Sequence, residues 1–166
     1  MTKYRNLSGQ DATRDEVVSF VELVQSGGAV DEYYVRQGLK RPGAKIVFAE
    51  VGCKVVGVAA LKIPSEQYRF GLQGAAKADY PLSQNDYPFE LGYVSVSPEH
   101  SGQGIARKLI KEVLLIAGGK GIFATTSHPA MKNILLPFFR FAPVGKSWIN
   151  ESGDVLHLLV RKSHSK

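Results

Sequence analysis

The chain has 166 residues, a formal charge of +6 and one cysteine, and 44% of its residues are hydrophobic. This length suits one domain with a real hydrophobic core, and the mixture of apolar and charged residues excludes global disorder. Because Cys53 has no cysteine partner, a disulfide framework and a cysteine-based zinc site are also excluded. The positive charge is compatible with an anionic partner but does not identify one.

Neither a membrane span nor an export signal is evident in the sequence. No apolar run reaches the roughly 18–20 residues that a membrane-spanning helix needs. The first residues are polar and lack the hydrophobic core of a signal peptide. We therefore expect a cytoplasmic protein with no membrane partner.

Two helices are predicted in the first 40 residues. Thr13 and Glu16 have the spacing of a capping box, and Gly27-Gly28 stops the helical pattern that follows them. The apolar residues of this pattern are Val17, Phe20, Val21 and Val24. A weaker helical pattern covers residues 30–37.

Residues 45–50 and 54–63 are rich in Val, Ile and Ala, and the break at Gly52-Cys53-Lys54 predicts a β-hairpin between them. Their apolar runs are nearly continuous, so we expect these strands to be covered on both faces. Residues 64–88 contain glycines and prolines with no sustained period, which predicts a long loop. Long loops in compact domains often act as lids or binding loops, and a surface insertion is the alternative.

A strand is predicted over residues 89–97, which Pro98 ends. The most regular helical pattern follows over residues 102–117, with apolar rows at four-residue spacing and glycines at its end. Residues 121–126 then form a short apolar strand.

The last part of the chain predicts a helix and a hairpin. Pro129 suits the first position of the helix, and Pro137 should end or kink it. Closing strands near residues 144–150 and 155–160 are joined by the turn at residues 151–154. The element order β, α, α, β, β, loop, β, α, β, α, β, β indicates an α/β (α+β) fold without a linker.

The turn before the helix at residues 102–117 is the strongest functional signal. The first backbone N–H groups of a helix have no intrahelical partner, and the helix dipole adds positive charge there. Gly102 and Gly104 have no side chain that would block a phosphate, and Arg107 adds charge, so the turn predicts an anion site. The alternative is that the glycines serve only a tight turn. Ile105 after Gly104 excludes a Walker A loop, and Arg107 stands where the third Rossmann glycine would be.

The same stretch resembles the GNAT superfamily of acetyl-CoA-dependent N-acetyltransferases. Ser101-Gly102-Gln103-Gly104-Ile105-Ala106 matches its motif at Gly104 and Ala106 and departs at Ser101, where the family has Gln or Arg. The flanking Val-Ser-Pro and Arg-Lys-Leu-Ile and the hairpin at residues 48–59 also resemble it. The resemblance implies a single GNAT-like domain over residues 1–166, a mixed sheet of about six to seven strands with about four helices, and a fourth and fifth strand that splay apart.

The resemblance also implies a cofactor site without a metal. The pantetheine arm of acetyl-CoA would lie along the backbone of Val94, Ser95 and Val96, as an added strand would. The pyrophosphate would lie against the residues from the turn into the helix, which are Ser101, Gly102, Gln103, Gly104, Ile105, Ala106 and Arg107. The Asp, Glu and His residues are too dispersed to predict a metal site.

Glu90 is the candidate general base. Acetyl transfer needs an unprotonated amine, and alkyl amines are mostly protonated at neutral pH. Side chains an even number of residues apart share a strand face, so Glu90 is expected to share one with Val94 and Val96. Some members of the family place a glutamate base at this position. The alternative is a solvated charge at the strand end.

The proton donor for the leaving thiolate is less well defined. Many family members use a tyrosine on the last major helix, and this chain has Leu136 there and Arg140 in place of a glycine. Tyr93 and His128 are candidate substitutes, and solvent is a third source. The alternative roles are packing for Tyr93 and helix capping for His128.

Acceptor recognition would fall to the first helices and to the long loop over residues 64–88, which is a candidate lid. The candidate lining residues are tyrosines, namely Tyr33, Tyr34, Tyr68, Tyr80 and Tyr87. Each of them is also compatible with an ordinary surface or core position.

The first hypothesis is thus an N-acetyltransferase that moves an acetyl group from acetyl-CoA to a primary amine by direct attack in a ternary complex. A GNAT-like enzyme that modifies nucleic acid is an alternative, based on the charge and the basic residues between Arg36 and Lys45. A non-catalytic CoA-binding module is another, based on the departures at Ser101 and Leu136. The closing strands are a candidate surface for a homodimer.

Overall fold

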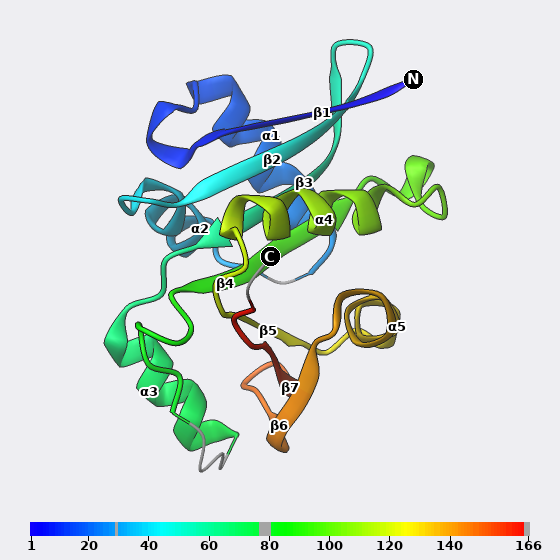
Figure 1. The fold of residues 1–166 in the computed structure, drawn as a ribbon. Coiled ribbons are helices and arrows are strands. Elements are labelled where there is room, and N and C mark those ends of the chain that lie inside the picture. Colours follow the sequence, from blue (N-terminus) through cyan, green and yellow to red (C-terminus); the bar gives the residue numbers. More distant parts are fainter. Residues whose placement is uncertain (29, 77–80, 165–166) are drawn as a thin grey trace. The chain divides into compact units, whose positions relative to one another are not determined.

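The computed structural model describes residues 1–28, 30–76 and 81–164. Their helices and strands are, in chain order, β1 (Thr2–Ser8), α1 (Arg14–Ser26), α2 (Glu32–Lys40), β2 (Lys45–Val51), β3 (Lys54–Lys62), α3 (Glu66–Ala75), β4 (Phe89–Val96), α4 (Ile105–Ala117), β5 (Ile122–Thr126), α5 (Pro129–Phe139), β6 (Ala142–Ile149) and β7 (Val155–Arg161). The strands form a mixed sheet of order β1-β2-β3-β4-β5-β7-β6 (Figure 1). The predicted fold class and element order are confirmed, with α3 as an addition. Among these residues, no helix is long and apolar enough to span a membrane.

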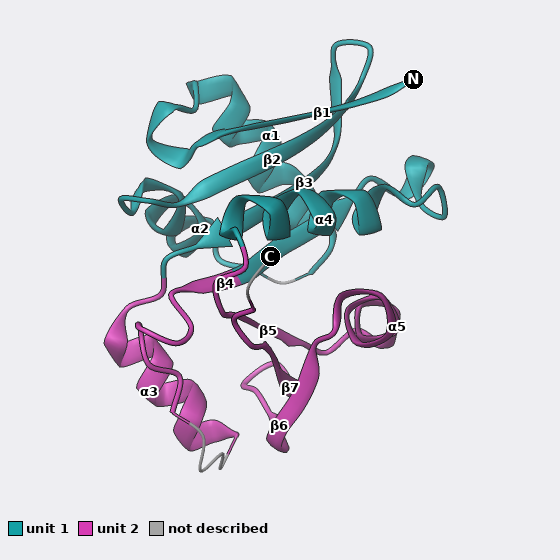
Figure 2. Cartoon of the chain, viewed as in Figure 1, with its two compact units in different colours: residues 1–63, 91–118 teal, residues 64–90, 119–166 magenta. Residues whose placement is uncertain are grey.

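The chain forms two compact units, shown in Figure 2. Unit 1 contains residues 1–63 and 91–118, and unit 2 contains residues 64–90 and 119–166. Strand β4 passes from unit 2 to unit 1 between Glu90 and Leu91. Its parallel ladder with β5 has two residue pairs, Phe89 with Ile122 and Glu90 with Phe123.

Unit 1 is built on the antiparallel strands β1, β2 and β3, with α1 and α2 on one face and α4 on the other (Figure 1). Phe48 pairs with Val58, and both are fully buried against the helix residues Phe20 and Val35. On the opposite face, a Cβ on Gly57 would lie 3.0 Å from Leu109 of α4. The strands are therefore covered on both faces, as their continuous apolar runs predict.

Helix α1 begins as its sequence predicts. The Glu16 N–H donates to Thr13 Oγ1 at 3.2 Å, and the Thr13 N–H donates to Glu16 Oε1 at 2.8 Å, which completes the capping box. Arg5 of β1 pairs with Glu16 at 2.6 Å and with Glu50 of β2 at 2.5 Å. The Thr13 N–H and the Arg5 guanidinium lower the pKa of Glu16. Three segments of unit 1 are thereby joined around one arginine.

Unit 2 pairs β7 with both β5 and β6. Phe123, Leu158 and Val160 pack with Leu82 and Tyr87 from the segment before β4. The predicted turn between the closing strands is confirmed. The Asn150 side chain accepts from the N–H groups of Ser152 and Asp154, and Gly153 adopts φ +84°.

The prediction of one loop over residues 64–88 is wrong for its first half, which is helix α3. Ser65 caps this helix by accepting from the Tyr68 N–H at 3.1 Å. Gly71 and Gly74 lower its intrinsic helix propensity and hid it from sequence reasoning. Packing of Leu72 and Ala76 into the core of unit 2 compensates for this. The candidate lining residue Tyr80 lies outside the described residues.

Helix α5 starts at Pro129 as predicted, but it continues two residues beyond Pro137. A proline this close to a helix end removes only one late backbone hydrogen bond, so the last residues remain helical. The helix is closed by Arg140 at φ +60°, with the Phe141 N–H donating to the Leu135 carbonyl at 3.2 Å. Arg140 thus occupies a left-handed position that favours glycine. Burial and the nearby Arg140 guanidinium lower the pKa of Arg161.

Replacing Arg140 with glycine is expected to raise the free energy of unfolding by about 1 kcal/mol, because glycine adopts this conformation without steric strain. Urea denaturation measures the change. The matched variant Arg140→Ala removes the charge but keeps the Cβ, so it should gain less than Arg140→Gly. Equal gains in both variants would assign the cost to charge repulsion rather than to backbone strain.

Candidate cofactor and catalytic site

The turn between β4 and α4 has the geometry expected of an anion site. Gly102 and Gly104 have φ of +76° and +78°, and α4 begins at Ile105 with no side chain capping it. The predicted helix start at residue 102 is therefore wrong, because both glycines have left-handed backbone conformations. The first N–H groups of α4 have no acceptor within the helix.

Open space surrounds these glycines. A Cβ on Gly102 or on Gly104 would meet no other atom within 4 Å. Ser101 and Gln103 are exposed beside them, and the Ser101 hydroxyl donates to the Pro98 carbonyl at 3.0 Å. Ser101 thus holds the turn where the family motif has a longer Gln or Arg. Exposed amides, a helix N-terminus and unobstructed glycines are a donor set that fits a pyrophosphate.

Strand β4 departs from regular alternation at Tyr93, which has φ +55°. A Cβ on Gly92 would lie 2.5 Å from Lys62, and the Tyr93 ring packs on Phe20 at 5.9 Å. Both residues therefore point to the face of the sheet that carries α1, as a bulge with a left-handed residue would produce. The Ser95 hydroxyl follows on the same face and donates to the Leu23 carbonyl at 2.7 Å.

The bulge corrects one step of the sequence argument. Glu90 lies two residues before Gly92, so its side chain faces the same side of the strand as Gly92 and Ser95. Val94 and Val96 alternate with Ser95, so their side chains face the opposite side of the strand. The expected shared face of Glu90, Val94 and Val96 is therefore wrong, because the even-spacing rule requires an uninterrupted strand.

Glu90 is buried, with 2% of its surface exposed, which contradicts the alternative of a solvated strand-end charge. The Tyr68 hydroxyl of α3 donates to Glu90 Oε2 at 2.8 Å. The Arg69 guanidinium is also close enough to attract the carboxylate. A carboxylate held by a hydroxyl and next to a buried cation is an arrangement that active sites use.

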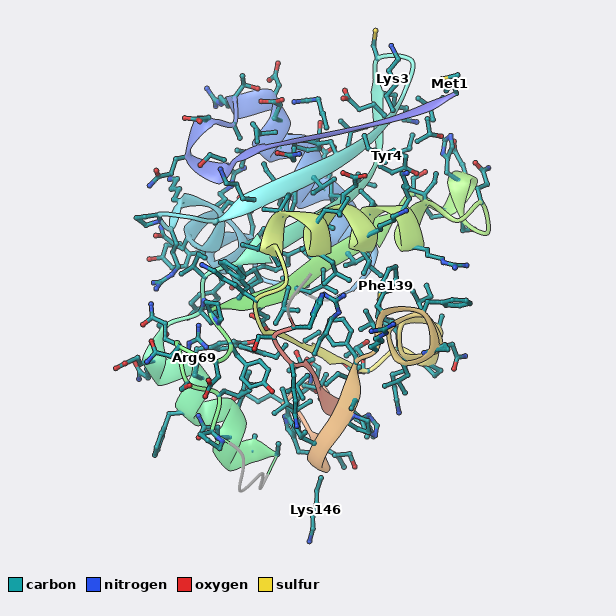
Figure 3. The ribbon with its side chains drawn as sticks, viewed as in Figure 1. Met1, Lys3, Tyr4, Arg69, Phe139 and Lys146 are labelled. Carbon is teal, nitrogen blue, oxygen red and sulfur yellow. The ribbon has the colours of Figure 1, made fainter. Side chains whose placement is uncertain are left out.

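Arg69 is a buried residue beside Glu90 that no sequence pattern indicated (Figure 3). It is 3% exposed, and burial lowers its pKa while the Glu90 carboxylate opposes that change. Its guanidinium lies over the Phe123 ring at 5.7 Å. It donates hydrogen bonds to backbone carbonyls that precede and follow α3. The carbonyl before the helix is that of Pro64 at 3.3 Å, and those after it are Leu82 at 3.2 Å, Ser83 at 3.5 Å, Pro88 at 3.0 Å and Tyr87.

The candidate proton donors have different surroundings. Tyr93 is partly buried in the core of unit 1, with Lys62 Nζ 4.6 Å from its ring centroid. His128 is exposed at the N-terminus of α5, and its side chain makes no capping hydrogen bond. His128 is thus the N-cap residue of α5, as its alternative role predicts, although its side chain does not bond to the helix. Tyr93 packs against the core of unit 1, which agrees with its alternative role.

The candidate acceptor-binding tyrosines also differ in their exposure. Tyr33 and Tyr34 of α2 are 63% and 68% exposed, and their rings meet edge to face at 5.4 Å. Tyr87 is 3% exposed and belongs to the core of unit 2. Tyr68 is 39% exposed and bonded to Glu90. Across residues 1–28, 30–76 and 81–164, no three His, Cys, Asp or Glu side chains are grouped as metal ligands.

Comparisons with known proteins agree with this fold. Among solved structures, the chain is similar to FeeM, an N-acyl amino acid synthase from uncultured soil microbes, with TM-score 0.74 and 14% identity over 98% of this chain and 91% of that one. It is similar to the ribosomal-protein-S18-alanine N-acetyltransferase of Escherichia coli, with TM-score 0.69 and 10% identity over 100% and 96%. It is also similar to yncA of Salmonella typhimurium, solved with acetyl-CoA, with TM-score 0.64 and 17% identity over 100% and 97%.

A search of curated proteins returns no match. The family model described as "Acetyltransferase (GNAT) domain" matches residues 42–136, which run from the β2–β3 hairpin through the glycine turn into α5. This span covers more than half of the chain and contains the turn at Gly102 and Gly104. The chain therefore belongs to the GNAT acetyltransferase family.

Proposed function

We propose that the chain transfers an acetyl group from acetyl-CoA to a primary amine, as a single domain over residues 1–166. The observation that carries the proposal is the open glycine turn at the N-terminus of α4, in a chain of this family. The yncA structure, solved with acetyl-CoA, supports the choice of donor. When bound, acetyl-CoA supplies the activated acetyl thioester.

The chain's own groups then have distinct tasks. The amides from Gly102 to Arg107 bind the pyrophosphate, and the β4 backbone at Val94, Ser95 and Val96 holds the pantetheine arm. Glu90 is the base that takes a proton from the amine. Tyr93, His128 or solvent returns a proton to the leaving thiolate. Tyr33 and Tyr34 offer exposed aromatic surface to the acceptor.

Three measurements test the proposal. Isothermal titration with acetyl-CoA and CoA tests the cofactor site, and absence of binding to both would overturn it. A thiol-release screen then compares small amines, polyamines, peptides and nucleic acid as acceptors. A parallel screen with longer acyl-CoA donors tests the acyl group, since the FeeM name refers to an N-acyl product. Binding without turnover on any acceptor would favour the non-catalytic alternative.

Replacing Gly104 with alanine is expected to weaken acetyl-CoA binding about tenfold or more. The added methyl group would occupy the open space beside the amides, at a residue whose φ is +78°. Gly153→Ala is the matched control, because Gly153 has φ +84° and equally open surroundings in the turn between β6 and β7. Equal weakening in both variants would mean that general strain, and not the anion site, is responsible.

A further inference from the structure

The burial of Glu90 poses a problem for its role as a base. A general base must reach the proton it removes directly or through one intervening group. Glu90 is 2% exposed, so an acceptor amine in solution has little direct access to its carboxylate. Tyr68, whose hydroxyl is 2.8 Å from Glu90 Oε2, retains 39% of its surface. The residue that hydrogen-bonds the buried carboxylate is therefore itself partly exposed.

The geometry points to Tyr68 as a proton relay between the acceptor amine and Glu90, and so as a further catalytic residue. The inference rests on the function proposed above. A phenol hydroxyl donates one hydrogen bond and accepts others, so Tyr68 can donate to Glu90 and accept from an ammonium group together.

The proton transfer leaves Tyr68 in its neutral, protonated form. The N–H bond of the bound ammonium breaks as its proton binds Tyr68 Oη, and the Tyr68 O–H bond breaks as its proton binds Glu90 Oε2. The nitrogen keeps the electron pair of the broken bond and can attack the thioester carbonyl. The net change is one proton moved from the amine to the carboxylate.

The surroundings keep the relay at hydrogen-bonding distance. The Tyr68 N–H is fixed by the Ser65 side chain at the first turn of α3. The adjacent Arg69 donates to the carbonyls of Tyr87 and Pro88, which lie immediately before β4. The two partners of the hydrogen bond are thus connected through backbone as well as side-chain contacts.

Tyr68→Phe keeps the ring and removes the hydroxyl. With the amine that releases CoA fastest in the screen as acceptor, we expect kcat to fall about 100-fold, with acetyl-CoA affinity and melting temperature unchanged. The double variant Tyr68→Phe/Glu90→Gln should be no slower than Glu90→Gln, because both residues serve one proton path. The rate of Tyr68→Phe should rise with pH in proportion to the unprotonated amine. Tyr4→Phe, which removes a hydroxyl on β1, is the control.

The outcomes separate the relay from the base. If Glu90→Gln is slow and Tyr68→Phe is at the parent rate, the relay is wrong and the base remains. If neither variant is slow, or no amine is acetylated, both proposals fail. Additive losses in the double variant, or a loss of acetyl-CoA affinity and melting temperature together with kcat, would overturn the relay in favour of a structural role.

Discussion

Replacing Glu90 with glutamine is expected to lower kcat by about 100-fold to 10,000-fold while acetyl-CoA affinity stays unchanged. Glutamine has the size of glutamate, and its amide oxygen can still accept the Tyr68 hydroxyl, so the packing around this buried side chain is kept. The amide cannot take up a proton at neutral pH. Thiol release under saturating acetyl-CoA measures the rate, and isothermal titration measures the affinity.

The control for charge is Glu151→Gln, which removes a carboxylate from the exposed turn between β6 and β7. It should leave the rate unchanged. A parent-like rate in Glu90→Gln would remove Glu90 from the mechanism. Its burial beside Arg69 would then be explained by folding alone, as one half of a buried pair of opposite charges.

Replacing Arg69 with methionine is expected to have the largest effect on stability, a loss of about 3 kcal/mol or more in the free energy of unfolding. Methionine fills a similar length but donates no hydrogen bond. The carbonyls that Arg69 now satisfies, those of Leu82, Tyr87 and Pro88 among them, would lose this donor. Urea denaturation measures the loss, and hydrogen exchange should locate it in residues 81–90.

Two further variants separate the causes of this loss. Arg69→Lys keeps the positive charge but not the planar set of donors, so its loss should be intermediate. Arg36→Met removes a partly exposed arginine of α2 that pairs with Glu32 at 3.3 Å, and it should change stability by less than about 1 kcal/mol. An Arg69→Met protein as stable as its parent would show that these carbonyls are equally well satisfied without the guanidinium.

Local signals allowed much of the fold to be predicted. The capping box at Thr13, the hairpin around Gly52 and the turn before Val155 each depend on residues close in sequence, and the structure contains all three. The glycine turn before α4 was also found, because a phosphate site at a helix N-terminus requires its small residues at neighbouring positions.

Contacts between distant residues could not be predicted in the same way. Tyr68 and Glu90 are 22 positions apart, and no periodicity links a tyrosine in one segment to a carboxylate in another. Arg69 was missed because the sequence suggests a surface charge, and only the fold supplies the carbonyls that surround it. The cap at Ser65, followed by Glu66, was a local signal for α3 that the two glycines outweighed.

The bulge at Tyr93 shows a different limit. A non-glycine residue with positive φ has no reliable sequence signal, and its packing on Phe20 and under Lys62 is tertiary. One such residue reverses the facing of every later side chain in the strand. In β4, the alternation of side chains therefore predicts a shared face only for residues that both precede or both follow residue 93.

The form of β6 bears on how two copies of this chain can associate. Its ladder with β7 shifts register between Val144 and Trp148, and Pro143 has no N–H to donate. The Lys146 N–H already donates to the Ala76 carbonyl at 2.7 Å, and its side chain extends away from the ribbon (Figure 3). These are the devices by which natural edge strands resist intermolecular pairing and aggregation. Self-association at the closing strands would thus depend on side-chain packing, because β6 is a poor template for extending the sheet into a second molecule.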